Sequence, residues 1–258
     1  MYAGELSARL RRDVVINADD FGRNEAINKA VLLSFEQGLV TSASLMPNAP
    51  GFEEACRIVQ RFELHAKIGL HIVLSAGEPI TREMRMERRF CTNDGTFRPN
   101  PKAREFRWLS SNERQSLLQE VEAQILKMKG KGLEPKHIDS HHHVHGIPSF
   151  AAVIIPLVRK YRIKSVRCLV NVQPPWGVGK RLYASIYNLI LGQLNLARTA
   201  RFGSIYNFLA YAKKHGRLPR GGSYEIMVHP ILGANSTVLE AQTGKALAAL
   251  LSELKELS

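Results

Sequence analysis

The sequence contains few cysteines and no export or membrane segment. Its three cysteines, Cys56, Cys91 and Cys168, are far apart and include no C-x-x-C pair, which argues against a disulfide framework and against a thiolate zinc site. Residues 1–12 lack the apolar stretch of a signal peptide, and no run has the apolar length of a membrane span. We therefore expect a cytoplasmic protein in a reducing environment.

Acidic residues are missing from one long part of the chain. None occurs between Asp139 and Glu225, whereas thirteen lysines and arginines do, a number equal to the net charge of +13. A strong positive field favours phosphorylated or lipid-surface partners over neutral ones, although an ordinary solubilising surface explains the same charge. We expect no nucleic-acid partner.

The chain of 258 residues fits one large domain, and we treat residues 1–258 as a single domain. Short apolar runs alternate with helical patterns: we expect strands at 13–18, 42–46 and 67–74, with helices at 24–38 and 52–61 between them. This order is typical of a parallel sheet with crossover helices. A barrel-like α/β domain is a natural match for the length.

The second half continues this pattern with interruptions. We expect a long irregular segment at 75–111, helices at 112–130 and 149–161, strands at 165–170 and 225–228, and a closing helix at 237–257. Irregular segments of this length are usually binding loops or lids. Residues 173–220 hold basic amphipathic helical segments, whose apolar faces either pack on the core or contact a membrane surface.

Histidine is concentrated in the stretch Asp139-Ser140-His141-His142-His143-Val144-His145. Imidazole is the commonest neutral metal ligand, so this density indicates a metal site. The stretch follows a short extended run and precedes a helical pattern, which places it at the end of a strand. Alternation in an extended strand would put His141 and His143 on one side and His142 on the other, and the residues alone leave open which one binds metal.

Three further groups end apolar runs: Asp19-Asp20, His71 and His229. The ends of parallel strands converge on one face, so these residues would meet in one pocket. One carboxylate with two imidazoles makes a three-ligand site for a divalent ion, and a second carboxylate can then act as a base on bound water. We expect the remaining histidines at 65, 137 and 215 to be surface or turn residues.

Four stretches resemble one known family. They are Val15-Ile16-Asn17-Ala18-Asp19-Asp20-Phe21-Gly22, Ile68-Gly69-Leu70-His71, the run from His137 to His145, and Glu225-Ile226-Met227-Val228-His229-Pro230. They are similar to the YdjC-like carbohydrate deacetylases, which include chitooligosaccharide deacetylases and the hopanoid-associated HpnK type. The resemblance spans residues 14–230, with only a loose match at about 173–220.

The resemblance implies a distorted (β/α) TIM-like barrel that works as a metal-dependent hydrolase. It implies a divalent ion, with magnesium first and zinc, cobalt or manganese as alternatives. The reaction would remove acetyl groups from N-acetylated sugars, in oligosaccharides or glycolipids. Carried over residue by residue, Asp20, His71 and His141 would bind the metal, Asp19 would be the catalytic base, and His229 a candidate acid.

The basic segment at 173–220 favours a glycolipid substrate and a peripheral position at the inner membrane face. His145 is a second candidate for the acid that an amine leaving group requires. The sequence leaves the oligomeric state open, with a homodimer as one option.

Three other interpretations remain. Two histidines and a carboxylate also describe non-haem iron oxygenases, although those ligands usually lie on an all-β fold. A metal-dependent phosphoesterase that acts on an anionic substrate would use the His141-His142-His143 run and benefit from the positive field. A non-enzymatic polyanion-binding protein explains the charge but not the ligands at the strand ends.

Overall fold

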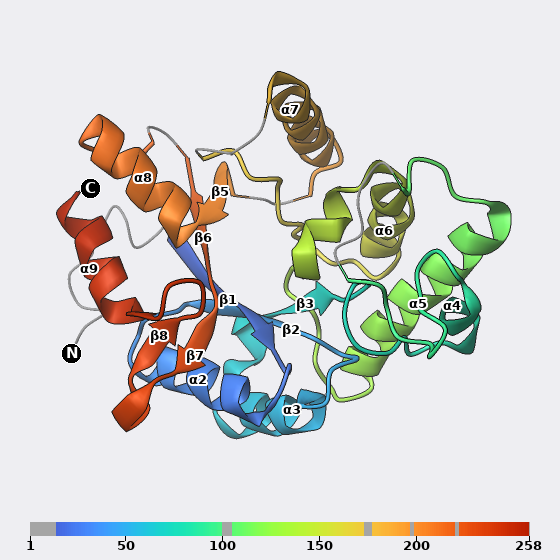
Figure 1. Cartoon of the computed structure of the whole chain (residues 1–258), viewed down its shortest axis with the longest axis horizontal. Coiled ribbons are helices and arrows are strands. Elements are labelled where there is room, and N and C mark those ends of the chain that lie inside the picture. The colour runs from blue at the N-terminus through green and yellow to red at the C-terminus, as the bar shows by residue number, and fades with distance from the viewer. Residues whose placement is uncertain (1–13, 100–104, 173–176, 197–198, 220–221, 258) are drawn as a thin grey trace. The chain divides into compact units, whose positions relative to one another are not determined.

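The computed structural model describes residues 14–99, 105–172, 177–196, 199–219 and 222–257 (Figure 1). They form two compact units. Unit 1 comprises Met1–Phe21, Glu25–Ala43 and Val166–Ser258, and unit 2 comprises Gly22–Asn24 and Ser44–Ser165. The expectations for residues 1–12, and for 173–176, 197–198 and 220 within the basic segment, lie outside the described residues.

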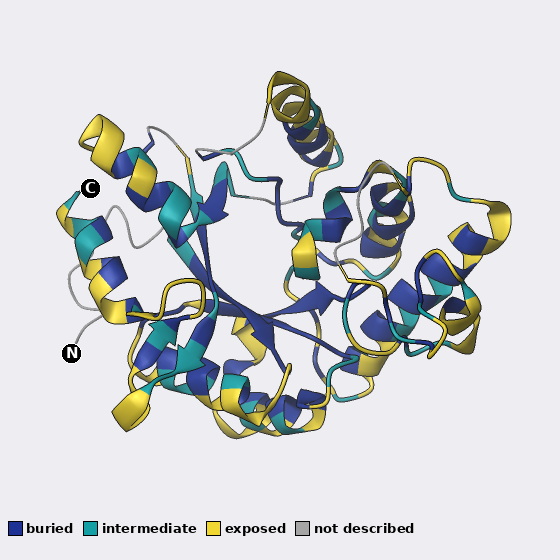
Figure 2. Cartoon of the chain, viewed as in Figure 1, coloured by how far each residue is buried: buried dark blue, intermediate teal, exposed yellow. Residues whose placement is uncertain are grey.

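Six strands of the described chain form one sheet in the order β4-β3-β2-β1-β6-β5. Their bounds are β1 (Val14–Phe21), β2 (Ser42–Leu45), β3 (Ile68–Ile72), β4 (Ile138–Ser140), β5 (Arg201–Ser204) and β6 (Tyr224–Val228). Nearly all of their residues are buried (Figure 2), which suits apolar parallel strands. The expected α/β class is confirmed. Within the described chain this order does not close on itself, so the barrel remains an expectation.

In unit 1, β6 runs parallel to both β1 and β5, with Ala18 opposite Val228 and Gly203 opposite Ile226. The helices described in this unit are α2 (Glu25–Glu36), α7 (Val178–Gln193), α8 (Ile205–His215) and α9 (Leu247–Glu256). A small antiparallel sheet follows β6 and consists of β7 (Pro230–Leu232), β8 (Val238–Glu240) and β9 (Lys245–Ala246), with the turn η3 (Ala234–Ser236) between β7 and β8. Helix α2 packs on β7, and α8 packs on α9.

In unit 2, β3 and β4 are parallel, with His71 opposite Asp139. The helices described here are α3 (Phe52–Arg61), α4 (Arg82–Met86), α5 (Ser111–Lys129) and α6 (Pro148–Lys160), with the 3-10 turns η1 (Leu64–Lys67) and η2 (His141–Gly146). Helix α5 starts with a capping box, in which Ser110 and Glu113 each accept a hydrogen bond from the other's backbone N–H. Helix α5 packs against α4 and α6.

The described residues of the segment 75–111 are largely irregular, as expected, apart from the short helix α4, and residues 100–104 lie outside the described residues. Its aromatic residues anchor it: the rings of Phe90 and Phe106 lie 5.5 and 5.0 Å from that of Phe150 on α6. The buried Glu120 carboxylate on α5 accepts hydrogen bonds from the backbone N–H groups of Ile80 and Thr81. Both ends of this segment are therefore tied to helices of unit 2.

Two sequence expectations were wrong in detail. The expected strand 165–170 is reduced to single β-bridges at Ser165 and Val166. Further along, the backbone of Leu169 hydrogen-bonds the Asn188 side chain instead of a neighbouring strand. The expected helix 237–257 begins only at Leu247. Its first part pairs as β8 with β7, so tertiary pairing overrides the local helical pattern.

Candidate active site

Asp19 and Asp20 lie near the end of β1 and are buried, with exposed fractions of 2% and 6%. Asp20 has a φ of 64°, in the left-handed region that L-residues rarely occupy. Asn17 donates a hydrogen bond from Nδ2 to Oδ1 of Asp19 at 2.8 Å. Both carboxylates are thus fixed at the strand end, where the sequence predicted them.

Sequence reasoning missed Arg167, which the structure places against Asp19. Its Nη1 and Nη2 donate to the two oxygens of Asp19, each at 2.7 Å, and its Nε donates to Oε1 of Glu225 at 2.5 Å. The guanidinium also lies 4.8 Å from the ring centre of Phe202. Arginine is suited to such planar two-point pairing. In the sequence, Arg167 is one of thirteen lysines and arginines between Asp139 and Glu225, and nothing there distinguishes it from the others.

His229 directly follows β6 and is therefore at the same strand end as Asp19 within unit 1. Its backbone N–H donates to Oε2 of Glu240 at 2.8 Å, and its Nδ1 lies 3.5 Å from Oε1. Burial alone would lower the pKa of His229. The hydrogen bond to Glu240 and the charges of Asp19, Glu240 and Asp20 raise this pKa above its usual value instead. The site therefore favours the protonated imidazole.

His71 lies at the end of β3, at the start of a buried hydrogen-bonded chain. Its Nδ1 contacts Oδ1 of Asp139 at 2.7 Å, and Oδ2 of Asp139 accepts from Ser44 Oγ, also at 2.7 Å. Ser44 Oγ lies 3.0 Å from Nε2 of His137. A carboxylate on Nδ1 fixes the ring and its tautomer, as is usual for metal-binding histidines.

The expectation of surface or turn histidines holds for His65 and His215, which are exposed. It is wrong for His137, which is only partly exposed and contacts Ser44. Its ring lies directly over Gly69 in β3, where a Cβ atom would be 2.3 Å from the ring. The absence of a side chain at position 69 therefore allows the ring to reach Ser44.

The histidine run does not continue the strand. His142 and His143 both have a φ of 55°, so the chain turns into η2 directly after β4. The expected alternation of His141 and His143 is therefore wrong. His141 is the member of the run whose ring lies beside His71, with ring centres 5.7 Å apart.

The other histidines of the run face different partners within unit 2. His142 contacts Ser75 Oγ through Nδ1 at 3.0 Å. His145 is buried, and its Nδ1 lies 2.6 Å from Ser140 Oγ. Ser140 Oγ also accepts the backbone N–H of His145 at 2.8 Å. His145 thus has a clear part in holding the turn, which makes it the weaker of the two candidate acids.

Asp20, His71 and His141 offer one carboxylate and two imidazoles, a donor set that could hold a metal ion. Asp19, His71 and Asp139 offer a second set, of two carboxylates and one imidazole. The first is better suited, because the carboxylates of Asp19 and Asp139 are already hydrogen-bonded at both oxygens within their own units. Oxygen and nitrogen donors of this kind fit a divalent ion without selecting one.

A family model described as YdjC-like protein matches residues 13–256. The chain belongs to the YdjC-like family. Among curated relatives, a carbohydrate deacetylase from Brevibacillus brevis is 32% identical over 166 residues, which cover 64% of this chain and 60% of the relative. One from Geobacillus stearothermophilus is 35% identical over 152 residues, or 59% of this chain and 58% of the relative.

A third YdjC-like relative, a carbohydrate deacetylase from Halalkalibacterium halodurans, is 30% identical over 219 residues and 84% of both chains. The first two matches cover only 60% and 58% of those relatives' length. A solved structure from Enterococcus faecalis V583, described as a cellobiose-phosphate cleavage protein, superposes with a TM-score of 0.67 and 22% identity, covering 95% of this chain and 88% of that one. It shows a shared fold.

Proposed function

We propose that this YdjC-like chain is a metal-dependent hydrolase that removes acetyl groups from N-acetylated sugars and releases acetate and a free amine. The observation that carries the proposal is that a carboxylate holds the His71 ring in one orientation. Because Asp139 holds its Nδ1, the ring is set to offer Nε2 as a ligand. The relatives named carbohydrate deacetylases supply the substrate class.

In this proposal Asp20, His71 and His141 bind the ion. When bound, a divalent ion polarises the acetamide carbonyl and lowers the pKa of water. The family resemblance favours magnesium, whereas two imidazoles suit zinc, cobalt or manganese at least as well. Reconstitution with each ion decides between them.

Asp19 takes the role of the base that accepts the proton of the attacking water. Its two oxygens are held by Arg167 in a planar pair, so the carboxylate has a fixed direction before substrate arrives. Oδ1 accepts from both Asn17 and Arg167, so the proposed water is oriented against the second lone pair of Oδ2. Arg167 is then a positioning residue.

His229 takes the role of the acid that protonates the departing amine. An amine leaves readily only once it is protonated, and the Glu240 contact favours the imidazolium that can supply this proton. Asp19 lies near the end of β1 and His229 follows the neighbouring parallel strand β6, which suits a base and an acid that act on one substrate.

The acetylated group belongs to an oligosaccharide or a glycolipid. We further propose, from the same resemblance, that the sheet is part of a distorted barrel. A reducing cytoplasm is the proposed setting, since Cys56, Cys91 and Cys168 are buried thiols outside any disulfide.

The test is acetate release from N-acetylglucosamine oligomers and from N-acetylglucosaminyl lipids by chain stripped of metal and reloaded with magnesium, zinc, cobalt or manganese. Asp19→Asn, His71→Ala and His229→Gln are measured alongside, and bound metal is counted for each. Asp19→Asn should lose turnover with its metal content unchanged, whereas His71→Ala should lose both.

Cleavage of p-nitrophenyl phosphate is measured with the same samples. Metal binding without acetate release, together with phosphoester cleavage, would overturn the deacetylase in favour of a phosphoesterase. Acetate release that persists in His71→Ala would overturn the assigned metal site.

A further inference from the structure

Helix α7 exposes a row of large apolar side chains. Nine large hydrophobic residues are exposed in the described part of the chain, and five lie on this helix, with exposed fractions of 84% for Val178, 61% for Leu182, 47% for Ile186, 59% for Leu189 and 42% for Ile190. Intervals of four, four and three residues put the first four on one helix face. Such a contiguous exposed row marks an interaction surface.

The opposite face of α7 is held in unit 1. Ala184, Tyr187 and Leu191 are buried there. The side chain of Asn188 accepts the backbone N–H of Leu169 at 2.9 Å and donates to its carbonyl oxygen at 3.3 Å. The two faces of the helix are therefore distinct, and Figure 2 shows exposed and buried residues along its length.

Arginines line a pocket beside this row. Arg181 of α7 and Arg201 of β5 border a pocket of about 510 Å³, together with Ser185 and Leu189. Guanidinium and hydroxyl groups are suited to phosphate oxygens. The pocket thus combines donors for an anion with an apolar residue of the exposed row.

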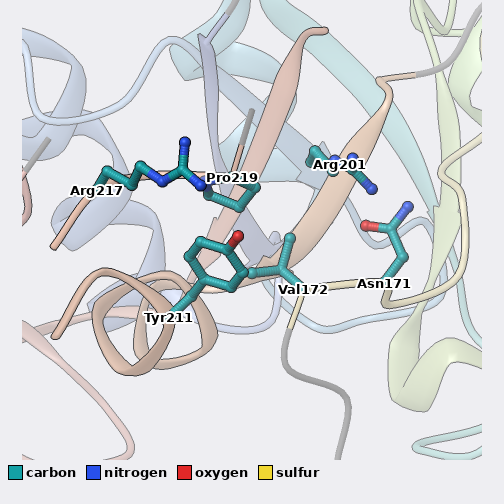
Figure 3. Close-up of a pocket in the computed structure, with 6 residues that line it drawn as sticks. All are labelled: Asn171, Val172, Arg201, Tyr211, Arg217 and Pro219. Carbon is teal, nitrogen blue, oxygen red and sulfur yellow. The ribbon is translucent and has the colours of Figure 1, made fainter. Parts of the chain in front are cut away.

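Arg201 also borders a second pocket, of about 240 Å³, with Arg217, Tyr211 and Asn171. Figure 3 shows Arg217 and Arg201 along one edge of this pocket, with Pro219 between them in this view and Tyr211 below Arg217. No acidic residue occurs between Asp139 and Glu225, and neither pocket has a carboxylate among the residues that line it. Both pockets favour anionic ligands.

The length of α7 decides how it can meet a lipid bilayer. It has 16 residues, a length of about 24 Å. None of the helices in the described residues combines the length and apolar character that a membrane span requires. A helix with one apolar face and flanking basic groups lies in the plane of the interface instead.

The charge of α7 also favours a lipid surface over a second copy of this chain as the partner of the apolar row. A symmetric dimer built on α7 would bring Lys180 and Arg181 of both copies into one interface, and α7 has no acidic residue to balance them there. An anionic lipid surface complements them.

We propose that α7 lies flat on an anionic phospholipid surface, with its apolar row among the acyl chains and lipid phosphates in the two arginine pockets. This inference goes beyond the proposed deacetylase activity and does not depend on it. A membrane-bound chain would meet lipid-linked sugars at the surface where they occur.

The test is co-sedimentation of the full chain with vesicles of phosphatidylcholine, alone or mixed with phosphatidylglycerol. The double variant Leu182→Glu/Ile186→Glu should abolish binding to the mixed vesicles. Met86→Glu is the matched control, since Met86 is 66% exposed but belongs to α4 of unit 2. Arg201→Gln and Arg217→Gln should each weaken binding about fivefold, whereas Arg114→Gln on α5 should not.

Equal binding to neutral and mixed vesicles would overturn the role of the arginines. Absence of vesicle binding would overturn the proposal. So would dimers, observed by sedimentation velocity, that the double variant dissociates while vesicle binding stays unchanged. Displacement from vesicles by millimolar inorganic phosphate would instead identify a site for free phosphate. Melting curves and acetate release from a soluble oligomer show that each variant is folded, and they test the deacetylase separately.

Discussion

Arg167 donates to both carboxylate oxygens of Asp19 at 2.7 Å, although the two residues are 148 positions apart. The same guanidinium holds Glu225, so one buried cation fixes two buried carboxylates of unit 1. The proposed base is therefore oriented by a residue whose side chain is fully buried.

Arg167→Gln should destabilise the fold and reduce turnover. It leaves Asp19 and Glu225 without their cation, at a cost of about 3–5 kcal/mol, as for other broken buried pairs. Urea unfolding measures this change. Arg167→Lys keeps the charge but cannot pair with both oxygens, so we expect kcat to fall with a smaller loss of stability. Equal kcat in the Arg167→Lys variant and the parent chain would contradict the positioning role.

Ser44→Ala should weaken metal binding by less than the roughly 10–100-fold typical when a group bonded directly to a metal ligand is removed, because Ser44 acts on His71 through Asp139. The substitution removes the donor to Asp139, so the carboxylate that orients His71 loses one of its contacts. Titration of the apo-protein with zinc measures the affinity. Ser34→Ala is the control: Ser34 is equally buried and its hydroxyl donates to the Ala30 carbonyl within α2, so its loss should leave the affinity unchanged.

The pH dependence should report on His229. Because its pKa is raised, His229 stays protonated to a higher pH than an ordinary histidine, whose pKa is 6.5. Activity should therefore persist above pH 6.5 and fall as pH rises through the raised pKa. Glu240→Gln removes a negative charge beside the ring and should move this alkaline limb to lower pH. Glu253→Gln on α9, an exposed carboxylate paired with Lys213, should not.

The same group affects stability. A pKa that is raised in the folded state contributes stability that is complete below the unfolded value and is lost as pH rises through the folded value. Glu240→Gln should therefore lower the melting temperature more at pH 5 than at pH 9. A pH-independent loss would show that Glu240 acts only through its bond to the His229 backbone.

Gly69→Ala should displace the His137 ring, because the new Cβ would lie 2.3 Å from it. Overpacking of this kind costs about 1–3 kcal/mol, and the loss of the Ser44 contact should also weaken metal binding. Gly179→Ala is the control, since nothing lies within 4 Å of its Cβ position in α7. A Gly69→Ala variant with parental stability and metal affinity would show that the ring moves without consequence.

Much of the fold could be predicted from local patterns. Helix α3 has the predicted bounds Phe52–Arg61, and α5 and α6 lie within one residue of theirs. The strand ends that carry Asp19, His71 and His229 were also predicted, because each closes an apolar run. The start of the last helix was not, since β8 forms only by pairing with β7.

The supporting groups of the site could not be predicted in the same way. Arg167, Ser44 and Glu240 act on residues far away in sequence, and their types are common in turns and on surfaces. The turn at His142 and His143 depends on left-handed backbone that histidine adopts only rarely, so alternation was the natural but wrong expectation.

The left-handed backbone at Asp20 has a consequence for protein engineering. A residue with a Cβ costs about 1–2 kcal/mol in this conformation, and glycine does not. Asp20→Gly should therefore melt higher than Asp20→Ala while both lose the metal, which calorimetry with and without zinc would test. A selection that ranks variants by heat tolerance alone would then favour glycine at position 20, and the selected variants would have lost their activity.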